Sequence, residues 1–538
     1  MSSTFSGFYV AKSGIQAARA NLQITGQNMT NVNTTGYTRQ RVDSYSLGPT
    51  GNNMRYTGGN LAIGNGVYCS GTSQIRDPYL DIRYRAEHAY VGKTDVQLDT
   101  LSDLEDIFDE SSKDGLSAQF SDLITQLNTL ASSPTYSSEN IVKNSAMLLT
   151  KAFNSASQQL SKIRKEQTKS LQDDAITKVN NLLKNIAHLN QEIKSSEISG
   201  TSALELTDQR NTMIDELSKY ANIEVSTKTV GVGSDRSVSE LHIDLVSGDQ
   251  KFSLVANGDY SEFSMTTNSG TGYVTMALKD VASDTPVQAV DSDGTPLFDS
   301  VTGDPVVMGN TDLTEGAFGG YLSMLNESGE FDPVTGERGL GYYEKMLDKL
   351  AVDFADTMNQ ANSTNESGVY NKPLFTTTDG TSTTGITAGN ISISTAWNTA
   401  TSSYITATKQ TGDVDTSSNG DNVLYMINQL GKDKTYTTNA NNTDGTTLFT
   451  TSIDSFISDL SVSVLALQKS DVNRQNTTYN STLTEIDTQR ASISSVDVNE
   501  EGINLIMYNQ SLTASSRFMT TLDEALDTII NKMGIVGR

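Results

Sequence analysis

Hydrophobic residues recur every seven positions near both ends of the chain. In residues 4–32, large apolar side chains mark one heptad position and mostly small side chains mark the second. These positions are Phe8, Ala11, Ile15, Ala18, Leu22, Thr25 and Met29. In residues 499–533, two similar rows are formed by Leu505, Tyr508, Leu512, Ser515, Met519, Leu522, Leu526 and Ile529. Such narrow stripes are typical of helices that pair along a coiled-coil seam, so the pattern predicts two terminal heptad helices.

Between these seams the spacing remains helical over long stretches. Residues 85–130 carry two apolar faces, and the segment from Ser137 to Ser199 contains neither Gly nor Pro. An unbroken helix over that segment would span roughly 90 Å and would need a partner helix along most of its length. The segment Leu204–Tyr220 is the first candidate for this partner. Helical spacing returns at residues 318–362 and 451–490.

At Ile223 the hydrophobic period changes to two. Short alternating runs follow, separated by turn residues such as Asp293-Gly294, which is typical of antiparallel strands. Residues 222–315 therefore predict an inserted antiparallel β domain with a core of its own. A Thr-, Ser- and Gly-rich stretch predicts a small β segment near residues 370–415.

These patterns predict a mainly α protein with a β insert. We expect residues 1–80 and 491–538 to pair as a coiled-coil terminal domain. Residues 81–221 and 316–490 should form a bundle of long helices, and residues 222–315 the inserted antiparallel β domain.

Composition narrows the functional classes. Only 36% of the 538 residues are hydrophobic and 7% aromatic, and Gly (41) far outnumbers Pro (8), which favours long helices and Gly-turned strands over a compact enzyme. The formal net charge of −26 disfavours nucleic acid and anionic membrane surfaces as partners. No segment is apolar for long enough to predict membrane insertion, and the N-terminus lacks the features of a cleaved secretory signal. The single cysteine, Cys69, excludes an internal disulfide and a Cys-rich zinc site.

Candidate chemistry is sparse. His88, His188 and His242 lie far apart in the sequence, and none begins a zinc-binding HExxH pattern. His188 lies beside an apolar face, where a solvated or capping role is expected. Trp397 is expected to be a buried anchor in the small β segment.

Two short motifs fail on inspection. Gly231-Val232-Gly233 lacks the third Gly of a nucleotide-binding loop, and no strand–helix unit follows it. Asp413-Val414-Asp415 resembles the start of a calcium loop, but Ser417 and Ser418 occupy positions that need a ligand and a glycine. We therefore expect no catalytic residue, metal or cofactor, and a protein that is not an enzyme.

A stronger signal lies in residues 21–41, NLQITGQNMTNVNTTGYTRQR. This string resembles the signature of the flagellar axial proteins, the family of rod, hook and hook-associated subunits, in which an Asn-rich helix end precedes Asn-Thr-x-Gly-Tyr or Phe. The matching positions are Asn28, Asn31, Asn33, Thr34, Gly36 and Tyr37. An Asn/Thr/Gly turn is unspecific alone, but it becomes specific directly after an N-terminal heptad helix.

The string SSVDVNEEGINLIMYNQSLTASSRFMTTLDEALDTIIN resembles the family's C-terminal half. The matching positions are Glu500, Glu501, Asn504, Leu505, Ile506, Tyr508, Ala514, Asp523, Leu526 and Ile529. Asn509, Leu512 and Ser516 depart from the usual Gln, Tyr and Ala, although Leu512 keeps the seam apolar.

Three inner strings resemble the hook-associated member that joins hook to filament. They are GLSAQFSDLITQLNTLASSP, LELTDQRNTMIDELSKYANIEV and GAFGGYLSMLNESGEF. The resemblance covers about residues 1–220, 316–375 and 451–533. It leaves the β insert uncovered.

The resemblance implies a structural subunit of the bacterial flagellum that lies outside the cell and is exported without a cleaved signal peptide. Its implied partners are further copies of itself in a ring or tube, the hook protein, the next hook-associated protein or filament side, and an export chaperone. Two alternatives remain open: another axial protein, such as a hook or rod subunit, and a binding or enzymatic module within the β insert.

A narrow apolar seam cannot be buried by one helix in water. The terminal helices should therefore either stay disordered until polymerisation supplies a partner, or pair within one chain, a pairing that could persist in the assembled subunit. The predicted assembly interface consists of Phe8, Ile15, Leu22, Met29, Leu505, Tyr508, Leu512, Met519, Leu522, Leu526 and Ile529.

Overall fold

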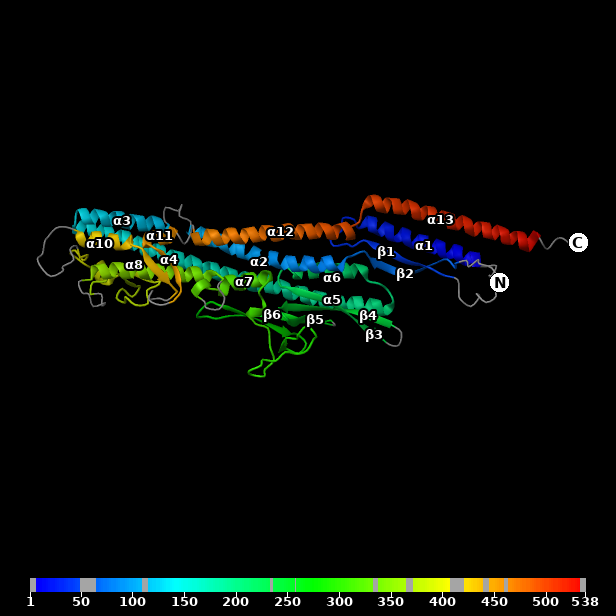
Figure 1. Cartoon of the computed structure of the whole chain (residues 1–538), viewed down its shortest axis with the longest axis horizontal. Helices are drawn as coiled ribbons and strands as arrows, with labels where there is room; N and C mark the ends of the chain where they lie inside the picture. Colours follow the sequence, from blue (N-terminus) through cyan, green and yellow to red (C-terminus); the bar gives the residue numbers. More distant parts are fainter. Residues whose placement is uncertain are drawn as a thin grey trace.

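Long helices run along an elongated molecule in the computed structural model (Figure 1). The structure describes residues 6–48, 64–108, 115–232, 236–256, 258–331, 337–363, 371–406, 420–438, 445–458 and 463–532. A pair of terminal helices occupies one end, a helical bundle forms the rest of the rod, and a β-sheet projects from its side (Figure 1).

The terminal helices are α1 (Ser6–Thr30) and α13 (Val498–Asp527), and they pack against each other within one chain. This is the second of the two predicted arrangements. A π-helical turn, Thr528–Lys532, extends α13. The antiparallel strands β1 (Gln40–Ser46) and β2 (Val67–Gln74) lie against α1.

The bundle supplies most of the hydrophobic core. Its long helices are α2 (Pro78–Phe108), α3 (Leu116–Ser132), α4 (Tyr136–Lys169), α5 (Thr177–Ser199), α6 (Leu204–Leu217), α7 (Gly316–Asn326), α8 (Leu340–Asn362) and α12 (Ala466–Ser494). The predicted continuous helix exists as α4 and α5, joined by a π-helical turn at Ser170–Ile176. Helix α6 packs along α5, as expected for its partner.

Two stretches predicted as single helices are interrupted. The stretch 318–362 divides into α7 and α8, and the backbone leaves the helical conformation at Glu327, directly after α7. The stretch 451–490 divides into the short α11 (Ile453–Ser458) and α12, preceded by the hairpin of β11 (Lys434–Thr437) and β12 (Thr447–Thr451).

The insert is an antiparallel meander of six strands in chain order. They are β3 (Ile223–Val232), β4 (Arg236–Ser247), β5 (Gln250–Ala256), β6 (Asp259–Thr267), β7 (Val274–Asp280) and β8 (Thr285–Pro286). Its buried face packs on α5, and Phe263 of β6 lies 5.0 Å from Phe318 of α7, measured between ring centroids. The expected separate core is therefore wrong, because the sheet and the helices share one continuous core.

Trp397 is buried, as predicted. It lies in the single-turn helix α9 (Thr395–Asn398), directly after the two-stranded sheet of β9 (Phe375–Thr377) and β10 (Ile391–Ile393). Its indole Nε1 donates a 3.0 Å hydrogen bond to the buried carboxylate of Glu139 in α4. The small β segment is thereby tied to the bundle.

Candidate functional site

The terminal helices meet through a face of small residues on α1. A Cβ placed on Gly7 would lie 3.0 Å from Leu522 Cδ1, and one on Gly14 would lie 2.9 Å from Ser515 Oγ. Because Gly7 faces Leu522 while Gly14 faces the earlier residue Ser515, the two helices are antiparallel. On this side of α1 the side chains of Ala11 and Ala18 are buried. The small heptad position thus sets the close approach of the helices.

The predicted interface residues lie on or beside this contact. The structure leaves nine of them half-buried: Phe8, Ile15, Leu22, Met29, Tyr508, Leu512, Met519, Leu522 and Leu526. Leu505 is 36% exposed and Ile529 is 53% exposed. Within one chain, the seam therefore holds the two helices together and leaves part of their apolar surface in contact with solvent.

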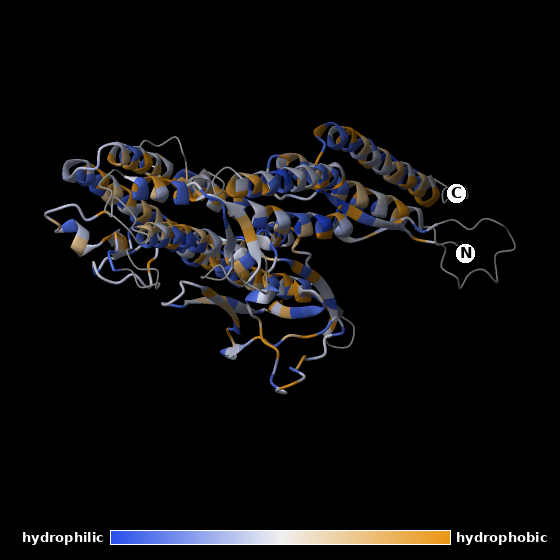
Figure 2. Cartoon of the chain, turned by 60° about the vertical axis from the view of Figure 1, so that its left-hand side comes forward, coloured by the Kyte–Doolittle hydropathy of each residue, from blue (hydrophilic) through white to orange (hydrophobic). Residues whose placement is uncertain are grey.

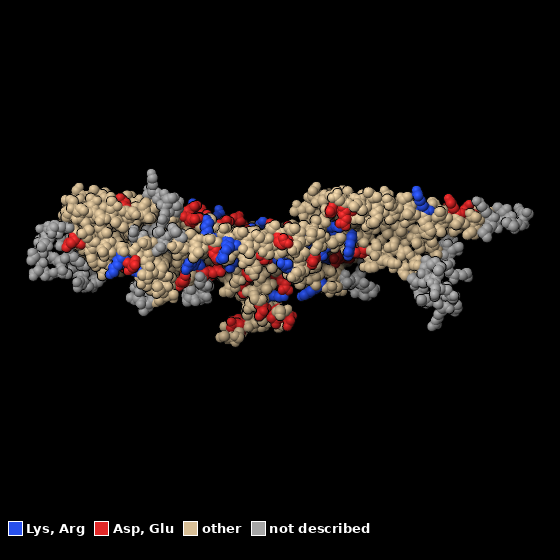
Figure 3. Space-filling model, turned by 45° about the horizontal axis from the view of Figure 1, so that its top comes forward, with Lys and Arg blue, Asp and Glu red and all other residues tan. Residues whose placement is uncertain are grey.

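Other apolar side chains of this end point outward. Among them are Tyr9 (69%), Ile503 (67%), Tyr45 (62%) and Ile506 (59%). They come from α1, α13 and β1, and Figure 2 shows hydrophobic residues recurring along α13. Charged side chains, by contrast, gather over the middle of the rod on the face seen in Figure 3. The terminal end thus presents an uncovered apolar surface.

The Asn-rich signature forms a small hydrogen-bond network where α1 ends. The buried Asn28 side chain donates to the Gln40 carbonyl at 2.9 Å and accepts from the Gln40 amide at 3.0 Å. The Tyr37 hydroxyl donates to Asn28 Oδ1 at 2.9 Å. Burial, with Asp208 and Glu205 close by, raises the pKa of Tyr37 to about 12 and keeps it a donor. Asn28 therefore fixes the path from α1 into β1.

The remaining signature residues shape the turn itself. The Thr34 hydroxyl donates to the Asn31 side chain, while Asn33 is exposed. Gly36 has a φ of +79°, and a Cβ there would overlap Thr212 Oγ1 of α6, so both backbone conformation and space require glycine. Next to it, the Thr38 amide donates to the buried Asp208 carboxylate at 3.0 Å. The turn is thus docked onto α6.

The C-terminal acidic pair binds Arg39, a residue that follows the signature. The guanidinium contacts both carboxylate oxygens of Glu500, at 2.8 and 3.0 Å, and Oε1 of Glu501 at 2.7 Å. Glu500 and Glu501 lie in the first turn of α13, where Asp497 caps the helix. Asn504, which also matches the family string, is half-buried one turn further on. The two terminal strings are therefore joined by a charge-assisted contact.

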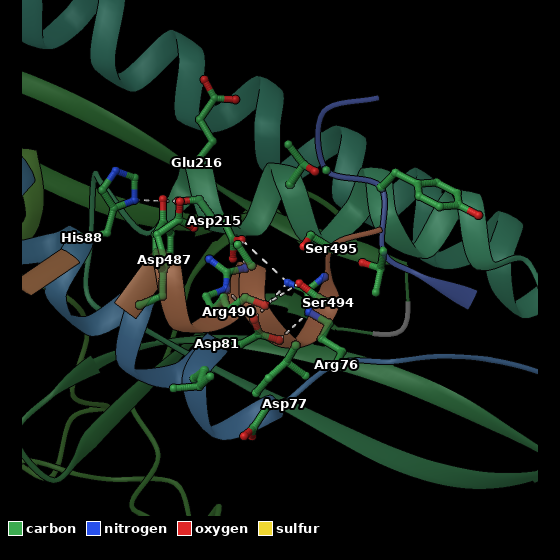
Figure 4. Close-up of a pocket in the computed structure, with 18 of the residues that line it drawn as sticks. Arg76, Asp77, Asp81, His88, Asp215, Glu216, Asp487, Arg490, Ser494 and Ser495 are labelled. Carbon is green, nitrogen blue, oxygen red and sulfur yellow. Dashed lines mark hydrogen bonds and ion pairs between the residues drawn. The ribbon is translucent and has the colours of Figure 1, made fainter. Parts of the chain in front are cut away.

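A second charged cluster lies just inside the bundle, between α2, α6 and α12 (Figure 4). Arg490 binds Asp215 at 2.6 Å and Asp81 at 3.0 Å, while Arg85 binds Asp215 at 2.8 Å and Arg76 binds Asp81 at 2.5 Å. Although burial favours protonation, the guanidiniums of Arg85 and Arg490 hold the pKa of Asp215 below its usual range. Two carboxylates are thus shared among three arginines.

This cluster borders a polar cavity of about 600 Å³ at the junction of the terminal pair and the bundle. Tyr37, Lys178 and Lys219 also line it. His88 lies at its edge, with Nδ1 2.9 Å from the Asp215 carbonyl oxygen and 3.1 Å from Ser218 Oγ. Burial lowers the pKa of His88, so a neutral imidazole donates to that carbonyl. We call the signature turn, the Arg39 contact and this cluster the joint.

Sequence reasoning identified the signature and the acidic pair but missed Arg39, Asp208, Asp215 and Arg490. One local signal was available for Arg490, which falls on the 3–4 spacing of Val472, Asn476, Tyr479, Leu483 and Ile486. A charged residue at such a position needs a buried partner. The partners themselves lie hundreds of residues away in the sequence, so no local pattern reveals them.

Some of the residues considered as chemical sites can be placed in the structure. His188 is exposed beside Glu192, and His242 lies half-buried on β4. Val232 ends β3, whereas Gly233 and the motif Asp413-Val414-Asp415 lie outside the described residues. Within the described ranges, no three His, Cys, Asp or Glu side chains are placed to hold a metal ion. Among the described helices, none combines the length and the apolar character that a membrane span requires.

Comparisons with known proteins identify relatives of this chain. The family model described as "Flagellar hook-associated protein FlgK helical domain" matches residues 101–375. "Flagellar hook-associated protein 1" of Bacillus subtilis (strain 168) is 26% identical over 560 aligned residues, which cover 100% of both chains. The protein of the same name from Salmonella typhimurium is 28% identical over 228 residues, covering 41% of this chain and 39% of that protein. A solved structure, the flagellar hook junction protein FlgK from Burkholderia pseudomallei, aligns with a TM-score of 0.39 and 20% identity over 56% of this chain and 45% of that chain.

Proposed function

The chain belongs to the family of flagellar hook-associated protein FlgK and is a structural protein of the flagellum, and we propose that copies of it join hook to filament by packing through their paired terminal helices. The assembling unit is the α1–α13 pair. Its seam residues, Leu512 and Leu522 among them, hold the pair together within each copy, and its outward apolar side chains meet neighbouring copies.

The observation that carries this proposal is the exposed apolar surface of α13. Ile503, Ile506 and Phe518 are 67%, 59% and 45% exposed on a helix whose other face is already occupied by α1. Several large apolar side chains left exposed on one helix indicate an interaction site. A ring or tube of copies would cover it in every subunit.

Replacing Ile506 with Asp tests this role. We expect normal thermal unfolding of the purified monomer, because the side chain is exposed, together with hooks that lack filaments in electron micrographs of cells carrying the variant. Burying a carboxylate against a neighbouring copy would cost several kcal/mol. The matched control is Thr513→Asp, also on an exposed position of α13. Filaments of normal number on Ile506→Asp cells would refute the proposal.

A subunit that joins hook to filament has a partner on each side. We propose that the hook protein lies on one side, the next hook-associated protein or the filament side lies on the other, and an export chaperone covers the terminal surface before assembly. Export is proposed to leave the first 30 residues in place, apart from possible loss of Met1, because cleavage there would remove α1. An intact-mass measurement on exported protein tests this, and a mass that lacks α1 would contradict it.

A further inference from the structure

Three chain segments meet where the terminal pair joins the bundle. One leaves α1 through residues 31–39, one returns from β2 to α2, and one connects α12 to α13. Arg39 contacts all three segments: its amide donates to the Ser494 carbonyl at 2.9 Å, and its carbonyl accepts from the Ile75 amide at 2.8 Å. Its guanidinium binds Glu500 and Glu501 at the start of α13.

The polar contacts of α13 converge on this residue. In the part of the chain that the structure describes, every ion pair of α13 is made with Arg39. The Glu501 side chain is 2% exposed and that of Arg39 is 17% exposed, so solvent screens their contact weakly. The neighbouring arginines Arg76 and Arg490 bind Asp81 and Asp215 inside the bundle instead.

We propose that Arg39 is a positioning residue that fixes the direction of the terminal helix pair relative to the bundle. Its rigid guanidinium fork holds two carboxylates on adjacent positions of α13, while its backbone holds the last turn of α12. The direction of the terminal pair relative to the bundle then decides whether the terminal pairs of neighbouring copies align. This last consequence rests on the proposed assembly function, whereas the positioning itself is a property of one chain.

Spin labels on one chain test the positioning directly. Because Cys69 is the single cysteine, a Cys69→Ser background allows labels at Ser481→Cys on α12 and Gln510→Cys on α13, both exposed positions. Double electron–electron resonance then measures the distance distribution between the two helices. For Arg39→Gln we expect this distribution to widen at least about twofold, because the pair can now open locally at the joint.

Two further variants isolate the cause. Arg39→Lys keeps the charge but cannot form the fork, so an intermediate width is expected. Arg41→Gln is the matched control, since Arg41 is 64% exposed and pairs with Asp43 of its own strand; it should leave the width unchanged. Circular dichroism of each variant verifies that the helices remain folded, and Arg39→Lys remains informative if Arg39→Gln does not fold.

If the distance between the two labels were as narrowly distributed in Arg39→Gln as in the parent protein, the inference would be overturned. An equal widening in Arg41→Gln would also overturn it, because the effect would then reflect lost charge alone. Neither result depends on assembly, which the Ile506→Asp experiment measures in cells. Failure of the positioning role and failure of the proposed function are therefore distinguished.

Discussion

Gly92 allows two helices of the bundle to approach closely. At Gly92 in α2, a Cβ would overlap the carbonyl oxygen of Lys219, which follows α6. Backbone cannot move aside as a flexible side chain can, so even one methyl group forces the helices apart. Gly92 thus allows α2 and α6 to carry Arg85 and Asp215 within ion-pair distance.

Gly92→Ala should therefore lower the free energy of unfolding by about 2 kcal/mol or more. Gly26→Ala is the matched control, because no other atom lies within 4 Å of a Cβ placed there. In that helix interior, alanine should instead stabilise by up to about 1 kcal/mol. Chemical denaturation of both variants measures the difference, and equal stability of the two would contradict the packing argument.

His88 gives the joint a pH dependence near neutrality. Its folded pKa lies below the ordinary 6.5, mainly through burial, while Lys219 lowers it and Asp215 and Asp95 raise it. Because the unfolded chain takes up a proton first, stability falls as pH drops below about 6.5 and levels off once the folded pKa is passed. Asp215, whose pKa is lowered, adds a further loss only in more acidic solution.

We expect thermal midpoints measured from pH 7.5 to 5.5 to fall in the parent protein and to fall less in His88→Gln. Glutamine keeps a donor for the Asp215 carbonyl but does not titrate. His188→Gln serves as the control, since His188 is exposed, and its profile should match that of the parent. A parent-like slope in His88→Gln would mean that other groups, such as His242, govern this range.

At the scale of elements, periodicity predicted individual helices and strands and missed the contacts between residues far apart in the sequence. The heptads gave α1 and α13, and the change of period at Ile223 gave the start of the sheet. The contact of Arg39 with Glu500 spans 461 residues, so only the folded chain brings these charges together. The shared core escaped prediction for the same reason, because alternation shows that a strand buries one face and not which element covers it.

Helix α12 is the least buried long element of the bundle. Val472 and Ile486 are its two buried residues, whereas sixteen residues of α8 are buried. Polar side chains take part in its contacts with α2, as where Asn476 donates to Asp95 Oδ1 at 2.8 Å. Elements with few buried apolar contacts open locally at low cost.

Backbone amides in the middle of α12 should therefore exchange with deuterium at least about tenfold faster than those of α8. Hydrogen exchange followed by mass spectrometry on the monomer measures both helices in one sample, so α8 is the internal control. Equal protection of the two helices would show that polar contacts hold α12 as firmly as a buried core does.

At the scale of the whole molecule, the β insert shares its core with the helical bundle. Phe252, Leu254 and Phe263 are buried in the core shared with the helices. The outlying turns differ: Phe298 is 58% exposed and Val301 is 91% exposed. The boundaries 222 and 315 stay predictions, but the packing predicts that the sheet contributes more to stability than its outer turns.

Two replacements separate these contributions. Exchanging residues 222–315 for a short Gly/Ser linker uncovers the side of α5 on which the sheet packs, so unfolding should begin at lower temperature and lose cooperativity. Exchanging only residues 298–304 for a similar linker removes an exposed turn and should leave the thermal midpoint nearly unchanged. Circular dichroism at 222 nm and calorimetry would follow both proteins. If the larger replacement unfolded as cooperatively and at the same temperature as the parent, the sheet would be a separate body after all. If trimming the turn were equally damaging, that turn would support the core from outside, and the buried face of the sheet would no longer account for the loss.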